Sequence, residues 1–386
     1  MKIGFFTDTY LPKSYGTELS IENFRQQLEL LGHQVFIFCP NYGGTISQEK
    51  IWRFQSVKIK NEPIEERILI WSKKIIREII KQKLDIVHAH TPFSAGWLAQ
   101  KVAKKTKVPL FYSSHMLYPE YAKYWLIKNN KLLPFFLKKY LKYYGNKCQA
   151  LIAPSLKMKK LLENYGVQRP IFVLPTGLDL KKIANAPKPE NNFKENFGLK
   201  KEDKILLYVG RITEEKNISF LINAFQKITK KRKDTYLLLV GDGPLETKMQ
   251  EKVKKLKIIS RVLFLGRLPW EKVLKLYQTS RVFVFASLTD TQGLIIAEAS
   301  YFGLPIVALK DDCYANILIN NKNGLTVYPH RTDLFAEKVL TILDNPELAK
   351  KFSDDGRQNA NNLSAEKQAQ KLIEIYQKIL HDYKNK

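Results

Sequence analysis

Short apolar runs alternate with longer amphipathic segments along almost the whole chain. Apolar positions such as Ile21, Phe24, Leu28 and Leu31 recur at helical spacing between the runs. Short unbroken apolar runs are typical of parallel strands that are buried on both faces. In the first half they lie at 2–7, 34–39, 84–90, 108–113, 150–153 and 171–174, and in the second at 204–210, 236–240, 262–266, 281–286 and 304–308. Two such series predict two doubly wound α/β domains.

A polar, proline-containing stretch at 179–190 separates the two series and predicts an interdomain linker. The first domain then covers residues 1–178 and the second covers 191–364. The tail from residue 365 has helical apolar spacing at Leu372, Ile375, Tyr376 and Leu380, which predicts a long final helix.

The charge of the chain is extreme. Its 386 residues include 64 Lys and Arg against 37 Asp and Glu, a net charge of +27. Such a field favours polyanions: nucleic acid, anionic lipid headgroups or phosphorylated substrates. The three cysteines are far apart in sequence, which predicts a reducing compartment without structural disulfides or zinc.

The sequence favours a cytoplasmic protein. Met1 leads directly into the first strand, so we expect no signal peptide. No apolar run approaches the roughly 20 residues that a membrane span needs. Any contact with a membrane should therefore be peripheral, at its inner face.

The stretch at 287–299 carries the strongest candidate chemistry. Asp290 and Thr291 fall at the C-terminal end of the strand predicted at 281–286, where open α/β sheets bind ligands. A helix follows, and its first backbone N–H groups and its dipole suit a phosphate. These groups belong to Gln292, Gly293 and Leu294. Glu298, about two helical turns beyond Asp290, suits a pair of ribose hydroxyls. The alternative is an ordinary strand–loop–helix turn with solvated carboxylates.

Arg211 and Lys216 form a second candidate site, five residues apart after the strand predicted at 204–210. Both side chains can reach one diphosphate, with arginine donating a bidentate pair and lysine acting as a point charge. The alternative is two solvated cations beside neighbouring glutamates. Gly241 and Arg267 follow the next two strands and are weaker candidates for contacts to the same ligand.

Three histidines and one glycine mark strand ends in the first half. His88 and His90 end the strand predicted at 84–90, but no third metal ligand is nearby, so structural histidines are favoured over a metal site. His115 ends the next strand, and its pKa suits hydrogen bonding to a sugar or proton handling near neutral pH; a core histidine is the alternative. Gly16 lies in the first loop, where a glycine serves a close ligand approach or only a turn.

The segment at 101–160 contains fourteen lysines and a single acid, Glu120. On a helical wheel its apolar face holds Leu133, Phe136, Leu137, Tyr140 and Tyr144. The opposite face holds Lys131, Lys138 and Lys142, with Lys139 beside them. Such a helix can lie in a membrane interface, or it can pack on its own domain with a solvated lysine face. Nucleic acid is another partner for a basic patch, but no recognition motif for it is present.

These motifs together resemble the retaining family 4 glycosyltransferases of the GT-B fold. The resemblance covers nearly the whole chain and rests on the segments at His90, His115, 154–155, 175–177, 210–211, 241–243 and 290–298. The sequence of residues 289–294 most resembles that of the bacterial 1,2-diacylglycerol 3-glucosyltransferases (monoglucosyldiacylglycerol synthases). Asp290 departs from that pattern, because these enzymes usually carry glutamate there.

The resemblance implies two Rossmann-like domains facing a cleft, with the C-terminal helix, residues 365–386, crossing back to the first domain. The first domain would face the acceptor and the membrane, and the second would bind the nucleotide sugar. Arg211 and Lys216 would hold the diphosphate, Glu298 the ribose, and Asp290 with Thr291, Gln292, Gly293 and Leu294 the sugar and phosphates. Gly16, Gly241 and Arg267 would add donor contacts, and His115 would lie near the reaction centre.

The reaction implied is transfer of glucose from UDP-glucose to 1,2-diacylglycerol at the membrane surface, with an anionic lipid as activator. We expect no essential metal, since fixed cations can stabilise the phosphates. The membrane and acceptor contacts would come from Lys131, Phe136, Lys138, Lys139, Tyr140 and Lys142. The alternatives are the same chemistry on phosphatidylinositol, a glucolipid or a polysaccharide precursor, and a basic nucleic-acid-binding protein with a decayed transferase core. The choice of glucose over galactose stays open.

Overall fold

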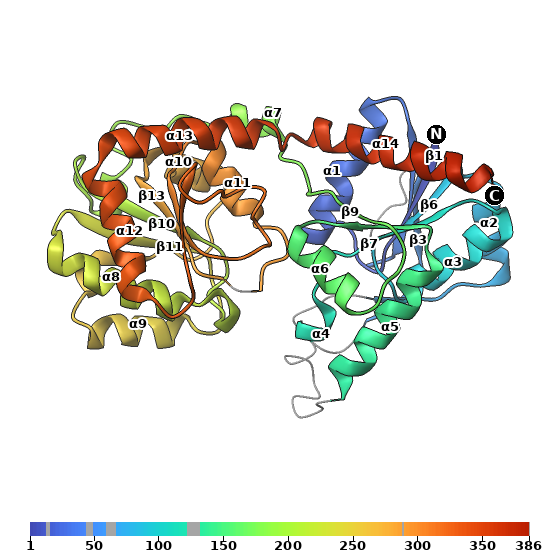
Figure 1. The fold of residues 1–386 in the computed structure, drawn as a ribbon, viewed down its shortest axis with the longest axis horizontal. Coiled ribbons are helices and arrows are strands. Elements are labelled where there is room, and N and C mark those ends of the chain that lie inside the picture. Colours follow the sequence, from blue (N-terminus) through green and yellow to red (C-terminus); the bar gives the residue numbers. More distant parts are fainter. Residues whose placement is uncertain (13–15, 44–48, 59–66, 122–131, 288, 386) are drawn as a thin grey trace. The chain divides into compact units, whose positions relative to one another are not determined.

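A computed structural model of the chain describes residues 1–12, 16–43, 49–58, 67–121, 132–287 and 289–385 (Figure 1). The chain forms two compact units, Met1–Gly177 with Ala365–Lys386, and Leu178–Ser364. The stretch predicted as a linker, 179–190, therefore belongs to the second unit. It contains helix α7 (Leu180–Ala184), which Asp179 caps and which buries Ile183 in the core of that unit.

The first unit contains a seven-stranded parallel sheet in the order β3-β2-β1-β6-β7-β8-β9. Its strands are β1 (Lys2–Phe6), β2 (Gln34–Pro40), β3 (Ile51–Phe54), β6 (Ile86–Ala89), β7 (Leu110–Ser113), β8 (Ala150–Ala153) and β9 (Ile171–Val173). A separate antiparallel hairpin joins β4 (Ser56–Lys58) and β5 (Arg67–Leu69). The direction in which strands are added reverses between β1 and β6, which makes this pair the switch point of the sheet.

Helices cover both faces of this sheet, so successive strand residues enter different cores. Phe5 packs in a cluster with residues of α1 and α14, whereas Phe6 packs in a cluster with residues of α2, α3 and α6. This two-sided burial explains the unbroken apolar runs. The helices are α1 (Gly16–Leu30), α2 (Lys73–Ile80), α3 (Ser94–Thr106), α4 (Tyr118–Tyr121), α5 (Leu133–Lys147), α6 (Leu156–Asn164) and α14 (Ala365–Lys384).

The final helix is an integral part of the first unit. Figure 1 shows α14, in red, beside α1, in blue, although more than three hundred residues separate them in sequence. Leu372 and Tyr376 of α14 are almost fully buried with Ile21 and Leu28 of α1. The first unit therefore has a complete core only when the chain has returned to it.

The second unit contains a six-stranded parallel sheet in the order β12-β11-β10-β13-β14-β15. Its strands are β10 (Lys204–Val209), β11 (Thr235–Val240), β12 (Val262–Phe264), β13 (Val282–Phe285), β14 (Ile306–Leu309) and β15 (Gly324–Val327). Counted from the start of the unit, this is the 3-2-1-4-5-6 order of dinucleotide-binding sheets, with its switch point between β10 and β13.

One continuous apolar core fills the second unit, and it includes both faces of the sheet. The helices that cover it are α8 (Ile218–Lys231), α9 (Glu246–Lys255), α10 (Trp270–Thr279), α11 (Leu294–Tyr301), α12 (Thr332–Asp344) and α13 (Pro346–Asn361). Short 3-10 turns lie at η2 (Glu195–Phe197), η3 (Glu214–Lys216) and η4 (Ile259–Arg261). Among the helices of the described ranges, none is long and apolar enough to cross a membrane.

Candidate functional site

The switch point of the second unit brings the predicted cations and the predicted acid together. Arg211 follows β10 and Asp290 follows β13, and these parallel strands are neighbours in the sheet. Lys216 ends the η3 turn and donates a hydrogen bond from Nζ to Oδ1 of Asp290 at 2.6 Å. Both side chains are about four-fifths buried, with relative exposures of 17% and 20%. Residues 74 apart in sequence thus form an ion pair at the sheet edge where α/β folds bind ligands.

The ion pair leaves acceptors on the β13 loop unused. Oδ2 of Asp290 and Oγ1 of Thr289 are buried, and neither has a hydrogen-bond partner within the described part of the chain. Buried polar atoms without partners are uncommon and destabilising. A ligand hydroxyl that donates to this loop would relieve that cost.

The strand exits at this edge approach each other closely. Gly241 has φ +126°, and a Cβ on it would lie 2.0 Å from the carbonyl oxygen of Gly210. Only glycine allows this approach, so Gly241 has a structural role whether or not it also contacts a ligand. Arg211 and Arg267 extend from the same edge, and both side chains are exposed.

Helix α11 starts beside the ion pair without a capping side chain. Gly293 occupies the N-cap position with φ +68° and makes no side-chain cap hydrogen bond. Gln292 is buried, while Thr291 and Leu294 are partly exposed. The first N–H groups of a helix need acceptors, so this start is suited to an anion.

Glu298 lies one turn into α11 and is held by a residue that the sequence did not indicate. The hydroxyl of Tyr277, on α10, donates to Oε2 of Glu298 at 3.1 Å. Burial raises the pKa of the Glu298 carboxyl to about 7, although the hydrogen bond from Tyr277 lowers it. No sequence motif signals Tyr277, because its apolar neighbours indicate only a core position.

In the first unit, the three histidines that were predicted to lie at strand ends form one stack on two adjacent strands. His88 and His90, two residues apart on β6 and its exit, point to the same side, and their ring centroids are 4.4 Å apart. His115 follows the neighbouring strand β7, and its Nε2 lies 3.0 Å from Nδ1 of His90. His88 is fixed from both ends, by the Tyr376 hydroxyl on Nδ1 at 2.5 Å and by Ser113 Oγ on Nε2 at 2.8 Å.

This network determines the protonation of the stack. Burial lowers the pKa of His88 to about 3 and of His115 to about 4, and it lowers the pKa of His90 well below its usual range. All three rings are therefore neutral near pH 7. Nε2 of His90 is buried without a partner in the described ranges. Because a buried N–H without an acceptor is rare, the His90 proton belongs on Nδ1, which donates to Nε2 of His115. His115 then carries its own proton on Nδ1.

Asp8 is a buried acid at the first switch point that the sequence analysis did not single out. It follows β1, and its carboxylate accepts hydrogen bonds from the hydroxyls of Thr91 and Ser94 and from the backbone N–H of Ala95 at 2.9 Å. Burial raises the pKa of Asp8 to about 6, although these donors lower it. Asp8 thus ties the first loop to the start of α3, and its position directly after a strand was a usable signal.

Gly16 begins α1, and none of the described residues around it requires a glycine there. Its φ is not positive, and a Cβ on it would meet nothing within 4 Å. The described residues around Gly16 therefore do not require a glycine, and its contact with a ligand stays a prediction.

Helix α5 uses only part of its apolar surface for packing. Leu137, Leu141 and Tyr144 are buried, at a spacing of four and three residues. The wheel placed Phe136 with this face, but Phe136 lies one position off the buried stripe and is 58% exposed. Lys138, Lys139 and Lys142 are exposed. Tyr140 is half-buried; its hydroxyl accepts from Trp97 Nε1 and donates to the Pro92 carbonyl. Lys131 lies outside the described residues.

Over the part of the chain that the structure describes, no group of three or more His, Cys, Asp or Glu side chains is arranged to hold a metal ion. His88 and His90 instead form the hydrogen bonds given above. All three cysteines are buried free thiols.

Both halves of the chain match models of known protein families. Residues 15–182 match a family model described as glycosyltransferase family 4, and residues 189–359 match one described as glycosyl transferases group 1. The chain is 31% identical to the alpha-monoglucosyldiacylglycerol synthase of Streptococcus pneumoniae, over 90% of this chain and 80% of that protein. The chain belongs to the group 1/family 4 glycosyltransferases. A synthase of the same name from Acholeplasma laidlawii is 28% identical over 100% of this chain and 99% of that protein.

Solved glycosyltransferase structures share the fold. Anabaena HepE in complex with UDP aligns with a TM-score of 0.77 at 18% identity, covering 98% of this chain and 100% of that chain. A glycosyltransferase from Rickettsia africae aligns with a TM-score of 0.76 at 25% identity, covering 98% of both chains. The fold is therefore GT-B, with two Rossmann-like domains, as the resemblance implied.

The raised pKa of Glu298 predicts a pH-dependent stability. Its folded pKa of about 7 lies above the ordinary value of 4.5, so the folded state binds this proton more tightly between those values. Stability from this group is full below pH 4.5 and is lost as the pH rises through 7. Between pH 5 and 8, we expect the free energy of unfolding of wild type to fall more than that of Glu298→Gln, by on the order of 1–3 kcal/mol. Denaturant titration measures both, with the exposed Glu374→Gln as control. Parallel curves for all three proteins would contradict the assignment.

Proposed function

We propose that this glycosyltransferase moves glucose from UDP-glucose to the 3-hydroxyl of 1,2-diacylglycerol and retains the anomeric configuration, giving an α-glucosyl-diacylglycerol. Two relatives named as alpha-monoglucosyldiacylglycerol synthases, at 31% and 28% identity over most of the chain, support this acceptor and product. The observation that carries the donor assignment is the Lys216–Asp290 pair at the switch point, one loop away from the uncapped start of α11.

In this proposal the donor diphosphate lies between the β10 and β13 exits. Lys216 binds one phosphate while keeping Asp290 beside the sugar, and the exposed Arg211 adds a bidentate contact. As the bond between the sugar and UDP breaks, negative charge grows on the leaving phosphate, and these cations stabilise it. Fixed cations and helix N–H groups take the place of a metal, so we propose that none is essential.

The nucleotide is held farther along α11. Glu298 accepts hydrogen bonds from the ribose hydroxyls, and Tyr277 keeps its carboxylate oriented. Thr291, Gln292 and Gly293 line the sugar and phosphates. In the first unit, the unhindered backbone at Gly16 gives room for close approach to the diphosphate.

The proposed role of His115 follows from its tautomer. A neutral imidazole with its proton on Nδ1 donates a hydrogen bond there, and its other nitrogen is engaged by His90. His115 then orients a sugar or acceptor oxygen and does not accept the proton of the acceptor hydroxyl. That proton passes to an oxygen of the departing phosphate, on the face where the new bond forms, which is consistent with retention.

The membrane contact is proposed to lie on the exposed side of α5. Leu132, Phe135 and Phe136 are each at least half exposed at its N-terminal end. Lys139 lies over the ring of Phe135 at 4.5 Å, so apolar and cationic groups share one surface. Aromatic side chains can enter the membrane interface while lysines contact anionic headgroups. Each lysine near such a surface contributes about 1 kcal/mol to membrane binding. The enzyme would act at the inner face of the cell membrane, with anionic lipid as activator.

The proposal is tested by measuring product formation from UDP-glucose on vesicles that contain diacylglycerol, with and without an anionic phospholipid. We expect a glucosyl-diacylglycerol whose formation depends on the anionic lipid. Phosphatidylinositol, a glucolipid and a soluble polysaccharide precursor serve as competing acceptors. Transfer to one of these in place of diacylglycerol would reject the acceptor and leave the donor site standing.

Lys216→Ala should lower turnover by more than tenfold, because a charge-assisted phosphate contact is worth more than about 1.4 kcal/mol. Lys230→Ala, an exposed lysine of α8 in the same unit, is the matched control. Steady-state kinetics with UDP-glucose measures both. Wild-type rates in Lys216→Ala would contradict the phosphate assignment.

His90→Ala should lower turnover by about tenfold, because it removes the N–H that fixes His115. His90→Asn should recover most of that loss, since the asparagine amide places an N–H close to the position of Nδ1. The thermal midpoint of each variant is measured beside its turnover. Equal losses in the two variants would mean that His90 serves only packing.

Changing Lys138, Lys139 and Lys142 together to Glu should abolish binding to anionic vesicles, measured by sedimentation. The control changes Lys227, Lys230 and Lys231 of α8, three exposed lysines of the second unit, in the same way. Unchanged vesicle binding in the α5 variant would show that this helix serves only its own domain.

A further inference from the structure

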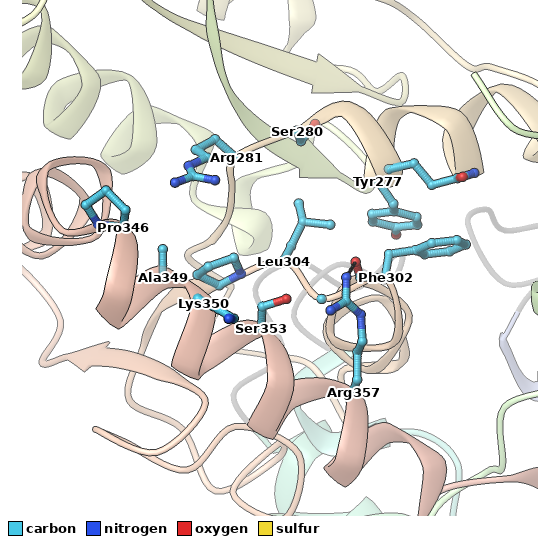
Figure 2. A pocket seen from close by; sticks show the side chains of 13 residues that line it. Tyr277, Ser280, Arg281, Phe302, Leu304, Pro346, Ala349, Lys350, Ser353 and Arg357 are labelled. Atoms are coloured by element: carbon cyan, nitrogen blue, oxygen red, sulfur yellow. Dashed lines mark hydrogen bonds between the residues drawn. The ribbon is translucent and has the colours of Figure 1, made fainter. Parts of the chain in front are cut away.

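The second unit contains a cavity at the sheet edge opposite the donor site. Its volume is about 300 Å³, and it lies where β13 and β14 begin: Arg281 directly precedes β13, and Pro305 directly precedes β14. One face of α13 closes it, through Pro346, Ala349, Lys350, Ser353 and Arg357. Figure 2 shows Arg281 and Arg357 on opposite sides of the cavity, with Leu304 and Ser353 between them.

The lining is cationic and contains no carboxylate. Arg281, Lys350 and Arg357 line the cavity, and none of the other lining residues is acidic. Within the described ranges, the side chains of Arg281 and Lys350 have no hydrogen-bond or ion-pair partner. Arg357 donates to the Phe302 carbonyl at 3.2 Å and lies 3.5 Å from the exposed Asp354. Two unpaired cations and one partly paired cation around a concave space attract an anion.

The floor of the cavity depends on a glycine. Gly303 has φ +75°, and a Cβ on it would lie 2.4 Å from both Ser353 Oγ and Arg357 Cζ. Any side chain there would displace the hydroxyl and the guanidinium. With glycine, Ser353 and Arg357 lie together over the backbone, a pairing of hydroxyl and guanidinium donors that suits the oxygens of one phosphate.

The size of the space narrows the ligand class. Pockets for small molecules begin at about 300 Å³, so this one has room for a phosphate joined to a body of a few heavy atoms. Most of the lining is polar, and Phe302, Leu304 and Pro305 supply a small apolar wall for that body. A bare inorganic anion would leave the wall uncovered.

The cavity shares a residue with the proposed ribose site. Tyr277 lines the cavity, and its hydroxyl is the donor to Glu298. Phe302, directly after α11, stacks on Tyr277 with ring centroids 5.7 Å apart and an interplanar angle of 14°. Tyr277 itself is only 1% exposed, so a molecule in the cavity would act on it mainly through Phe302, whose ring packs against it.

We propose that this cavity binds a small soluble phosphomonoester, and that its occupancy changes nucleotide affinity through Tyr277 and Glu298. The binding half stands on the cavity alone. The coupling half rests on the proposed function, since it requires Glu298 to hold the ribose. Coupling between two sites is reciprocal, so the nucleotide must change phosphomonoester affinity by the same factor.

The binding half is tested by calorimetric titration of the full chain with glycerol 3-phosphate. All proteins carry Lys216→Ala, which weakens phosphate binding at the proposed donor site. Arg281→Gln with Lys350→Gln should weaken the remaining binding at least tenfold. Arg331→Gln with Lys351→Gln, an equal charge change at exposed residues outside the cavity, should leave it unchanged. Equal affinity in the two double variants, or no binding by the Lys216→Ala parent at millimolar ligand, would overturn the site.

Two further arms separate the alternatives. Inorganic phosphate should bind more weakly than glycerol 3-phosphate; equal affinity would show that the apolar wall contributes nothing to binding and would reject an organic phosphomonoester as the preferred ligand. Vesicles of phosphatidic acid present the same headgroup on a membrane, and cavity-dependent binding to these alone would reject a soluble ligand.

For the coupling half, UDP affinity of the otherwise wild-type chain is measured with and without saturating glycerol 3-phosphate. We expect at least a threefold change, which the cavity double variant and Tyr277→Phe both lose. An unchanged UDP affinity would reject the coupling. Absence of UDP binding in every protein would instead reject the proposed function, while the titration in the Lys216→Ala proteins would still report on the cavity.

Discussion

Parallel strands can be connected only by crossovers that return the chain to the starting edge of the sheet, so every strand of a parallel sheet ends at the same edge. This constraint organises both units. In each sheet the strand order reverses once, between β1 and β6 and between β10 and β13, and at these points the two exit loops diverge. The histidine stack and Asp8 lie at or next to the first reversal, and the Lys216–Asp290 pair lies at the second. Residues far apart in sequence lie close together there because all the parallel strands of a sheet end at the same edge.

The ion pair at the second reversal holds two charges in place. Lys216 is largely buried, and without a counter-charge it would be costly to keep in that position. Asp290 supplies this charge through a single oxygen. In the proposed donor site, Lys216 is held in place before the diphosphate binds, and fixed charges of this kind can lower a barrier without reorganising during the reaction. The shorter aspartate in place of the usual glutamate is sufficient to reach Lys216.

The sequence predicted the parts of this structure that depend on local pattern. The period of apolar residues predicted the two α/β series. Residues in the loops after strands, such as Arg211, Asp290 and His115, were predicted to face a ligand, and this stays a prediction. The roles of Tyr277 and Tyr376 depend on tertiary packing, and nothing in their local sequence marks them. The wheel could not separate the buried Leu137 from the exposed Phe136, because it gives direction around the helix axis but not which arc the rest of the domain covers. The 179–190 stretch looked like a linker because it is polar and contains proline, yet one buried isoleucine anchors it to the second core.

The place of α14 has a consequence for synthesis of the chain on the ribosome. The second unit is a single continuous segment, Leu178–Ser364, so all its strands are available before α14 has been translated. The first unit starts earlier but waits for Leu372 and Tyr376 to fill the gap beside α1. Translation order and completion order are therefore inverted: the earlier sequence finishes later. During that interval the α1 side of the first sheet exposes apolar surface, which gives chaperones a defined period and a defined surface on which to act.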